Sequence, residues 1–181
     1  MENKSKTIHF RLVELSDAEF INSLRVDITY NKYLSAVDGD ISKQEEWIKK
    51  YKVREKLGLE YYYIIQRNSD CLPIGTVRLY DFSKKNSSFC WGSWILNENK
   101  TRYAALESAL LIYDFAFLEL GFNRCHMDIR KQNLKVLEFH KKFGITLIGE
   151  TEEDYLAYYF KECYLGIRDE INEVIEGANT K

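Results

Sequence analysis

Several features that mark special classes of protein are scarce or missing in this sequence. Only one of the 181 residues is proline, and the chain has no low-complexity tract, no linker rich in glycine and serine and no repeat of fixed period. Hydrophobic residues make up 45% and aromatic residues 14%, as is typical of a globular protein with a substantial core. The length therefore predicts a single domain over residues 1–181, with frayed ends at about 1–6 and 177–181.

Net charge, long apolar runs and paired cysteines are also scarce. A net charge of −2 argues against a nucleic-acid partner, because neutralising phosphates needs a clustered positive surface. No run is long enough to cross a bilayer and no apolar secretion segment follows the first lysines, so we expect no membrane partner and a cytoplasmic protein. The four cysteines form no CxxC pair and no Cys/His metal pattern, which predicts reduced thiols and no metal.

The most informative stretch runs from Trp94 to Leu110. It leaves a predicted strand, Phe89–Leu96, and passes through a polar loop into a helix predicted over Tyr103–Leu120. That helix is apolar on almost every face and should be largely buried. The loop places the cationic side chains of Lys100 and Arg102 beside the unbonded N–H groups and the positive dipole end of the helix. This arrangement predicts an anion site.

Apolar spacing and turn residues predict the other elements. Strands are expected at Thr7–Val13, Leu59–Gln66, Pro73–Phe82, Arg124–Ile129, Thr146–Glu150 and Tyr155–Glu162. Helices are expected from a cap at Asp17 through Leu24, from Ser42 toward Leu57, over about Asn133–Phe143 and over Ile167–Ile175. The segment Val26–Asp40 is irregular and dense in hydrogen-bonding groups. This order suits an α/β fold in which a mixed sheet is flanked by helices.

Together with the segment Asn133–Ile145, the stretch from Trp94 to Leu110 resembles the GNAT superfamily of acetyl-CoA-dependent N-acetyltransferases. The resemblance covers most of the chain. It implies the GNAT fold, in which a mixed central β-sheet is flanked by helices and two strands splay apart to open a cofactor cleft. The resemblance places that splay between Phe89–Leu96 and Arg124–Ile129.

The resemblance also implies an acetyl-CoA site. A strand resembling the run that ends in Trp94 holds the pantetheine arm, and a loop patterned Arg/Gln-x-x-Gly-x-Gly/Ala grips the pyrophosphate through backbone amides. Lys100, Tyr103 and Ala105 stand at the patterned positions, so a tyrosine replaces the first glycine, which is the residue that tolerates a positive φ. The expected cofactor-binding residues are Trp94, Ile95, Leu96, Lys100, Arg102, Tyr103, Ala104, Ala105, Leu106 and Asn133.

The predicted helix Asn133–Phe143 offers a catalytic candidate. Amide formation from a thioester needs a proton for the departing thiolate. A spacing of seven residues puts Asn133 and His140 on one helix face, and many GNAT enzymes place a tyrosine that donates this proton at the position of His140. The resemblance therefore makes His140 the expected general acid, as an imidazolium near its ordinary pKa. The alternative is that His140 only packs or caps the helix and that water protonates the thiolate.

No general base is evident from the sequence. Many relatives carry a glutamate on the strand before the Gly-Ser-Trp run, where this chain has Cys90, which we expect to pack in the core. Deprotonation of the acceptor amine is therefore expected to run through water. Because Tyr103 and Cys90 both depart from common family choices, a catalytically impaired domain that only binds acyl-CoA is the alternative from another class.

The acceptor is expected to be a small molecule with a primary amine. The run Asn133–His140 looks most like the corresponding run in GNAT enzymes that acetylate nucleotide-linked amino sugars. Hydroxyl-pairing and ring-stacking groups suited to a sugar or base are the expected substrate-binding residues: Arg25, Tyr30, Asn31, Tyr33, Tyr80 and Trp91. The alternatives are a protein N-terminus, since Phe10–Val13 and the helix with Trp47 resemble enzymes that acetylate ribosomal proteins, and a polyamine or aminoglycoside. The aromatic-rich final strand suits a homodimer as well as a core.

Overall fold

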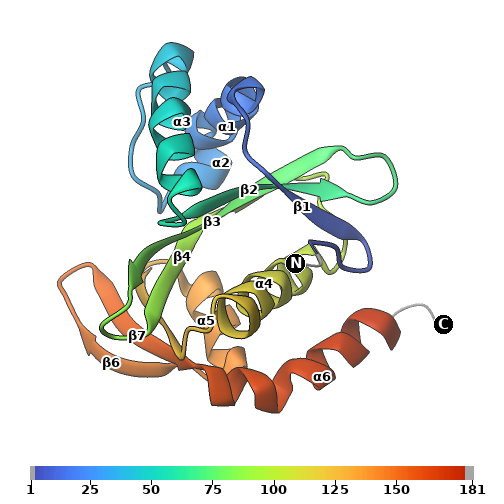
Figure 1. The fold of residues 1–181 in the computed structure, drawn as a ribbon, viewed down its shortest axis with the longest axis vertical. Helices are drawn as coiled ribbons and strands as arrows, with labels where there is room; N and C mark the ends of the chain where they lie inside the picture. Colours follow the sequence, from blue (N-terminus) through green and yellow to red (C-terminus); the bar gives the residue numbers. More distant parts are fainter. Residues whose placement is uncertain (1–2, 178–181) are drawn as a thin grey trace. The chain divides into compact units, whose positions relative to one another are not determined.

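The computed structural model describes residues 3–177 and forms a seven-stranded sheet flanked by helices (Figure 1). Its strand order is β1-β2-β3-β4-β5-β7-β6. The strands are β1 (Ile8–Leu12), β2 (Tyr61–Arg67), β3 (Pro73–Ser83), β4 (Ser88–Leu96), β5 (Arg124–Arg130), β6 (Thr146–Glu150) and β7 (Asp154–Phe160). The helices are α1 (Ala18–Val26), α2 (Ile28–Asn31), α3 (Ile41–Lys56), α4 (Ala104–Tyr113), α5 (Leu134–Phe143) and α6 (Lys161–Gly177).

The sheet is mixed, as predicted. Strands β1 and β2, β2 and β3, β5 and β7, and β6 and β7 pair antiparallel, whereas β4 and β5 pair parallel. The parallel pairing joins Ser88 to Arg124 and Phe89 to Cys125, at the start of both strands. The splay expected between these strands stays a prediction. The predicted α/β fold with a mixed sheet and flanking helices is thus confirmed.

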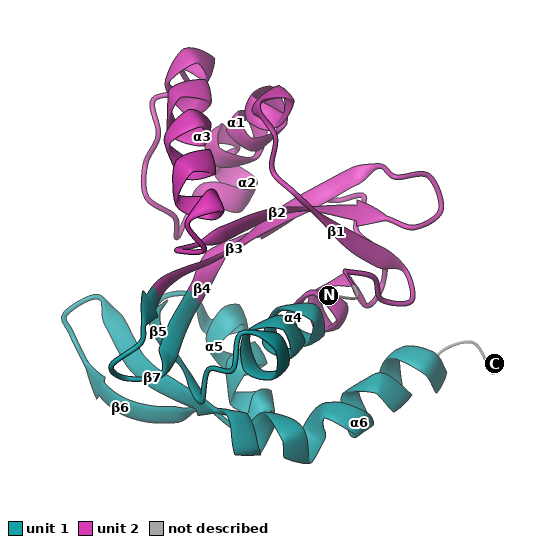
Figure 2. Cartoon of the chain, in the orientation of Figure 1, with its two compact units in different colours: residues 1, 82–90, 109–181 teal, residues 2–81, 91–108 magenta. Residues whose placement is uncertain are grey.

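The contacts of the chain divide into two compact units (Figure 2). Unit 2 consists of residues 2–81 and 91–108, and unit 1 contains residues 82–90 and 109–181. Strand β4 and helix α4 each run through both units. The single domain expected from the sequence stays a prediction. Of the ends expected to fray, residues 1–2 and 178–181 lie outside the described residues, while Ser5 N–H donates to the carbonyl of Ile8 at 2.8 Å.

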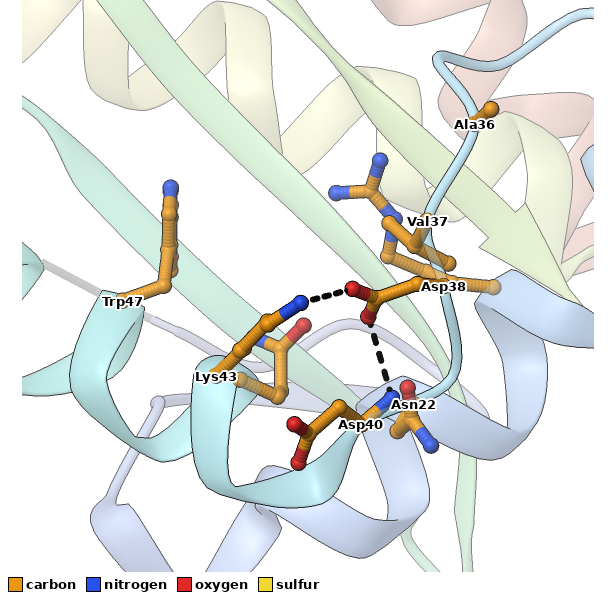
Figure 3. Close-up of a pocket in the computed structure, with 9 residues that line it drawn as sticks. Asn22, Ala36, Val37, Asp38, Asp40, Lys43 and Trp47 are labelled. Atoms are coloured by element: carbon orange, nitrogen blue, oxygen red, sulfur yellow. Dashed lines mark hydrogen bonds and ion pairs between the residues drawn. The ribbon is translucent and has the colours of Figure 1, made fainter.

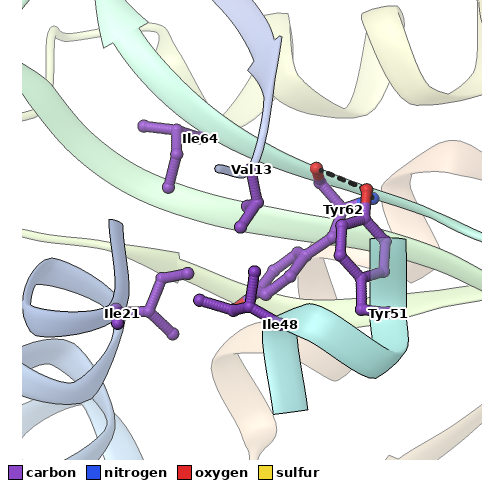
Figure 4. Close-up of a cluster of buried hydrophobic side chains, with 7 residues drawn as sticks. Val13, Ile21, Ile48, Tyr51, Tyr62 and Ile64 are labelled. Atoms are coloured by element: carbon purple, nitrogen blue, oxygen red, sulfur yellow. Dashed lines mark hydrogen bonds between the residues drawn. The ribbon is translucent and has the colours of Figure 1, made fainter. Parts of the chain in front are cut away.

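The core of unit 2 lies between its sheet and two helices. Tyr62 and Ile64 are two residues apart on β2, so both side chains point to the face where α1 and α3 pack (Figure 4). The hydroxyl of Tyr51, on α3, accepts a hydrogen bond from Tyr62 N–H at 2.8 Å. The buried cluster consists of Val13, Ala18, Ile21, Ile48, Tyr51, Tyr62 and Ile64.

The helix starts in unit 2 differ in detail from the predictions. Asp17 does precede α1, but its carboxylate forms a two-bond ion pair with Arg11, at 2.7 Å for each bond, and does not cap the helix. Helix α3 begins one residue before Ser42, because the carboxylate of Asp40 accepts from Ser42 N–H at 2.9 Å. The segment expected to be irregular holds the short helix α2, capped by Asp27.

In unit 1 the predictions differ from the structure in the type of one helix and in the ends of the last strand and the last helix. The helix expected over Tyr103–Leu120 becomes a π-helix from Asp114 to Glu119, a widening that apolar periodicity does not reveal. Strand β7 ends at Phe160 and α6 follows at once, so the last strand is shorter and the last helix longer than predicted. Tyr164 on α6 is buried and its hydroxyl donates to the Asp114 carboxylate at 2.6 Å. This bond joins segments that are distant in the sequence and fixes α6 against the π-helix that follows α4.

Candidate active site

Strand β4 departs from regular geometry where the pantetheine arm was expected. Ser93 has φ +46°, in the left-handed region that side chains disfavour, and its carbonyl accepts a hydrogen bond from the Thr76 hydroxyl at 2.8 Å. At Ile95, two residues after Ser93, the backbone of β4 lies very close to the backbone of β3. A Cβ on Gly75 of β3 would lie 2.0 Å from the Ile95 carbonyl oxygen. Only glycine fits this approach. The indole rings of Trp91 and Trp94 lie 5.2 Å apart.

The loop after β4 leads into α4 as the sequence predicts. Helix α4 begins at Ala104, and the first bond of helical spacing runs from Glu107 N–H to the Tyr103 carbonyl at 2.9 Å. The N–H groups of Ala105 and Leu106 therefore precede the first intrahelical donor. Tyr103 has no positive φ, so tyrosine is not strained at the patterned glycine position. The Arg102 guanidinium lies 5.2 Å from the centre of the Tyr103 ring, so the tyrosine supports a cation at the helix start.

A buried carboxylate that the sequence analysis did not single out as functional ties this helix start to β1. Glu107 is fully buried, and its carboxylate accepts from Thr7 N–H at 2.6 Å and from the Thr7 hydroxyl. The hydroxyls of Thr7 and Thr101 lie 2.6 Å apart. The signal in the sequence was an acidic residue in a helix that is otherwise apolar. The bonds from Thr7 to Glu107 and the contact between Thr7 and Thr101 therefore fix the loop that carries Lys100 and Arg102.

Helix α2 brings two predicted substrate-binding residues against other parts of unit 2. The Tyr30 hydroxyl donates to the Glu98 carboxylate and accepts from Glu98 N–H at 3.3 Å. Asn31 donates from its amide to the Arg25 carbonyl at 3.0 Å. The Arg25 guanidinium in turn donates to the carbonyl and hydroxyl of Ser35, at 3.0 and 2.8 Å. The structure thus joins Arg25 with Asn31, and Tyr30 with the loop after β4.

The remaining predicted substrate-binding residues are more dispersed. Tyr80 stands beside β4, because a Cβ on Gly92 would lie 3.0 Å from its hydroxyl oxygen. The Arg78 guanidinium lies 4.7 Å from the centre of the Tyr80 ring. The ammonium of Lys32 lies 5.1 Å from the ring centre of Tyr33.

A pocket of about 270 Å³ lies in unit 2 between α1, α3 and the segment that joins α2 to α3 (Figure 3). Of the predicted substrate-binding residues, only Arg25 lines it, and no carboxylate among residues 3–177 forms an ion pair with its guanidinium. Lys43 pairs with Asp38 across the pocket. The other lining residues were missed: Asn22, Ala36, Val37, Asp38, Asp40, Lys43, Gln44 and Trp47. Their separation in sequence hides them, since α1 and α3 meet only after folding.

His140 and Asn133 lie in unit 1, on and before α5. His140 is buried, and desolvation lowers its pKa to about 4. The imidazole is therefore neutral at pH 7, and the assumption of an imidazolium with an ordinary pKa is wrong. Asn133 is the N-cap of α5, and its carboxamide oxygen accepts from Val136 N–H at 3.4 Å. This leaves the amide N–H groups of Asn133, rather than the whole carboxamide, for a ligand.

Known proteins match this chain over most of its length. A family model described as the acetyltransferase (GNAT) domain matches residues 7–146. The chain belongs to the GNAT acetyltransferase family. A solved structure described as apo FdhC, a nucleotide-linked sugar GNAT, is 50% identical with a TM-score of 0.87, and the match covers 94% of this chain and 96% of that chain. The predicted family and the predicted class of enzyme, an N-acetyltransferase, are confirmed.

More distant GNAT relatives show the fold and little beyond it. The ribosomal-protein-S5-alanine acetyltransferase from Vibrio fischeri is 16% identical with a TM-score of 0.73, over 88% of this chain and 96% of that chain. The SPbeta prophage-derived uncharacterized N-acetyltransferase YokL of Bacillus subtilis (strain 168) is 23% identical over 168 residues, 91% of this chain and 92% of that protein. Identities this low leave the acceptor of this GNAT chain open.

The residues of unit 2 fit the cosubstrate that GNAT acetyltransferases use, acetyl-CoA. Amide donors of Ala105 and Leu106 at the start of a buried helix, together with Lys100 and Arg102, have the chemistry that a pyrophosphate needs. Within residues 3–177 no cluster of three His, Cys, Asp or Glu side chains could hold a metal ion. No helix in that range is long and apolar enough to span a membrane.

Proposed function

We propose that this N-acetyltransferase transfers the acetyl group of acetyl-CoA to the primary amine of a nucleotide-linked amino sugar. The observation that carries this proposal is the 50% identity, over 94% of the chain, to a structure described as a nucleotide-linked sugar GNAT. The likeness to the ribosomal-protein enzyme, at 16% identity, supports a common fold only. When bound, acetyl-CoA supplies the acetyl thioester, and the residues of this chain bind and orient both substrates.

In this proposal the cofactor lies along β4 and the start of α4. The pyrophosphate accepts from the backbone amides between Arg102 and Leu106, and Lys100 and Arg102 add positive charge. Two structural features support the assignment. The carboxylate of Glu107 and the hydroxyl of Thr7 hold the loop in place, and the Tyr103 ring supports Arg102.

Replacing Lys100 and Arg102 together by alanine is expected to raise the Michaelis constant for acetyl-CoA by roughly a hundredfold or more, since each of the two charge-assisted hydrogen bonds contributes about 1.5–3 kcal/mol. Turnover at saturating acetyl-CoA should change little, and the effect should shrink as salt rises. The matched control is the double variant Lys49→Ala/Lys50→Ala, which removes two exposed charges from α3. An unchanged Michaelis constant at physiological salt would show that the pyrophosphate binds elsewhere.

The pocket beside Arg25 is the proposed place for part of the acceptor. Its volume of about 270 Å³ is smaller than the roughly 300–1,000 Å³ of a pocket for a drug-sized ligand, so it holds one moiety and not a whole sugar nucleotide. The Arg25 guanidinium suits a phosphate, because it has no carboxylate partner among the described residues. The amides of Asn22 and Gln44 and the carboxylates of Asp38 and Asp40 suit hydroxyl groups.

His140 is the residue that we propose moves the proton. A neutral imidazole has one donor and one acceptor nitrogen, so it can take the proton that the amine loses and release one at the leaving group. The low pKa favours rapid release. A negative charge that develops beside the ring raises the pKa of His140 and so draws the proton onto it when it is needed.

The identity of the acceptor is tested by incubating the protein with acetyl-CoA and a panel of amines, with released thiol as the readout. We expect turnover with nucleotide-linked amino sugars and at least about tenfold lower kcat/KM with the same amino sugars lacking the nucleotide, because Arg25 then loses its phosphate partner. Peptides with free N-termini and polyamines complete the panel. Turnover of peptides or polyamines with none of the sugars would overturn this acceptor.

A further inference from the structure

Ser93 has a backbone conformation that serine rarely adopts. Its φ of +46° lies in the left-handed region, where a Cβ crowds the backbone, and a strand interior offers no local compensation. Such a conformation persists only when surrounding contacts determine it. The residue also stands between Gly92 and Trp94, within the part of β4 assigned to acetyl-CoA. The contacts that hold Ser93 are therefore candidates for a role in the reaction.

One contact of this kind comes from β3. Thr76 is fully buried, pairs with Ile64 across the β2–β3 ladder and donates its hydroxyl proton to the Ser93 carbonyl at 2.8 Å. The threonine stands on the same sheet face as Ile64, and hence on the face where α1 and α3 pack. No bulk water reaches this hydroxyl. The bond is thus made inside the core, where leaving the carbonyl unbonded is costly.

Thr76 is itself held by a second hydroxyl. The side chains of Tyr62 and Thr76 are hydrogen-bonded, and burial raises the pKa of the Tyr62 phenol. The Ser93 carbonyl can only accept, so the Thr76 proton goes to it, and the Tyr62 hydroxyl is a second polar group beside Thr76. The tyrosine ring is fixed by edge contacts with Trp47 and Tyr51, at 5.7 and 6.0 Å between ring centres. Polar contacts therefore lead from the helix-packed core through Thr76 to β4.

We propose that Thr76, oriented by Tyr62, is a positioning residue for acetyl transfer. It keeps Ser93 in the left-handed conformation and so fixes the directions of the backbone N–H and C=O groups from Gly92 to Ile95. The role in the reaction rests on the proposed function, because it matters only if β4 receives the acetyl-CoA arm. A purely structural Thr76 would instead fill space, and valine, which has the same shape, would serve as well.

The test compares Thr76→Val and Thr76→Ser, with Thr146→Val on the exposed strand β6 as the matched control. Thr76→Val is expected to lower kcat by roughly tenfold or more, since misplacing the reacting groups is costly, while the dissociation constant of coenzyme A measured by calorimetry changes by less than about threefold. Thr76→Ser keeps the hydroxyl and should retain most of the turnover. Equal activity of the valine and serine variants would overturn the proposal.

A double variant separates positioning from packing. Glycine adopts positive φ without a steric cost, so Ser93→Gly in the Thr76→Val background should recover at least about half of the lost turnover. A variant that had merely lost packing at Thr76 would gain nothing from this change. If Thr76→Val does not fold, Tyr62→Phe serves instead, because it removes the hydroxyl beside Thr76 and keeps the ring; its kcat should fall in the same direction.

A measurement that needs no acceptor keeps this inference separate from the proposed function. The φ-dependent coupling between the amide and α protons of Ser93, read by nuclear magnetic resonance, should differ between the wild-type protein and Thr76→Val. If the coupling changes but no amine is acetylated, the proposed function fails and the positioning of Ser93 by Thr76 stands. An unchanged coupling in Thr76→Val would overturn the positioning role even in an active enzyme.

Discussion

Alanine in place of Gly75 is expected to destabilise the protein more than any other single methyl group added to a strand. The new Cβ would lie 2.0 Å from the Ile95 carbonyl oxygen and 3.1 Å from the Ile95 carbonyl carbon, and backbone atoms within a sheet cannot move aside as a side chain can. We expect a loss of at least about 3 kcal/mol in the free energy of unfolding and a fall in Tm of about 10 °C or more. Thermal unfolding followed by circular dichroism measures both.

Gly166 provides the control for this substitution. It lies within α6, has no heavy atom within 4 Å of a built Cβ and has an ordinary φ. Gly166→Ala should therefore raise the free energy of unfolding by about 0.5–1 kcal/mol, because alanine loses less conformational freedom in a helix than glycine. A Gly75→Ala protein with the Tm of the wild type would show that β3 and β4 do not approach each other as described.

His140→Ala is expected to lower kcat by roughly a hundredfold while the affinity for acetyl-CoA changes little, since the variant loses a proton relay and not a cofactor contact. Stopped-flow release of the thiol, compared with equilibrium binding of coenzyme A, separates the two quantities. His126→Ala, which removes the other histidine of unit 1, is the matched control. Undiminished turnover in His140→Ala would reduce His140 to a packing residue.

The buried imidazole of His140 should also make the free energy of unfolding depend on pH. The pKa of the buried imidazole is about 4, below the 6.5 of an unhindered histidine, so between these values the unfolded chain binds a proton that the folded chain does not. The free energy of unfolding therefore falls as pH drops from 6.5 to 4, by about 3 kcal/mol from this group at 1.36 kcal/mol per pH unit. His140→Ala should lack this part of the acid destabilisation in denaturant titrations at each pH.

Local patterns in the sequence predicted the elements of the candidate site that follow one another directly along the chain. Strand β4, its loop and the start of α4 follow one another within about twenty residues, so periodicity and helix-start signals suffice. The spacing also placed Asn133 and His140 on one face of α5, but it did not reveal that His140 is buried. The cap at Asn133 was readable in principle, because asparagine is a preferred N-cap, but the family pattern drew attention to a ligand role instead.

The parts that escaped prediction depend on residues far apart in the chain. The Thr7–Glu107 bonds join positions 100 residues apart, and the approach of Gly75 to Ile95 depends on the twist of two strands. The positive φ of Ser93 could not be predicted from residue type, because serine has no particular preference for the left-handed conformation. The pKa of His140 depends on what covers the ring, which one helix cannot reveal. The π-helix from Asp114 likewise keeps the apolar pattern of an α-helix.

The hydrogen bond between Tyr30 and Glu98 could couple the two binding events of the proposed function, that of the acceptor and that of acetyl-CoA. It joins α2, where acceptor contacts are expected, to the loop that leads to the proposed pyrophosphate site. A ligand that strengthens or breaks this bond on one side changes the free energy of binding on the other, and linkage requires the two substrates to alter each other's affinity by the same factor. In the proposed function, this one phenol and carboxylate therefore help to set how strongly acetyl-CoA and the acceptor change each other's affinity.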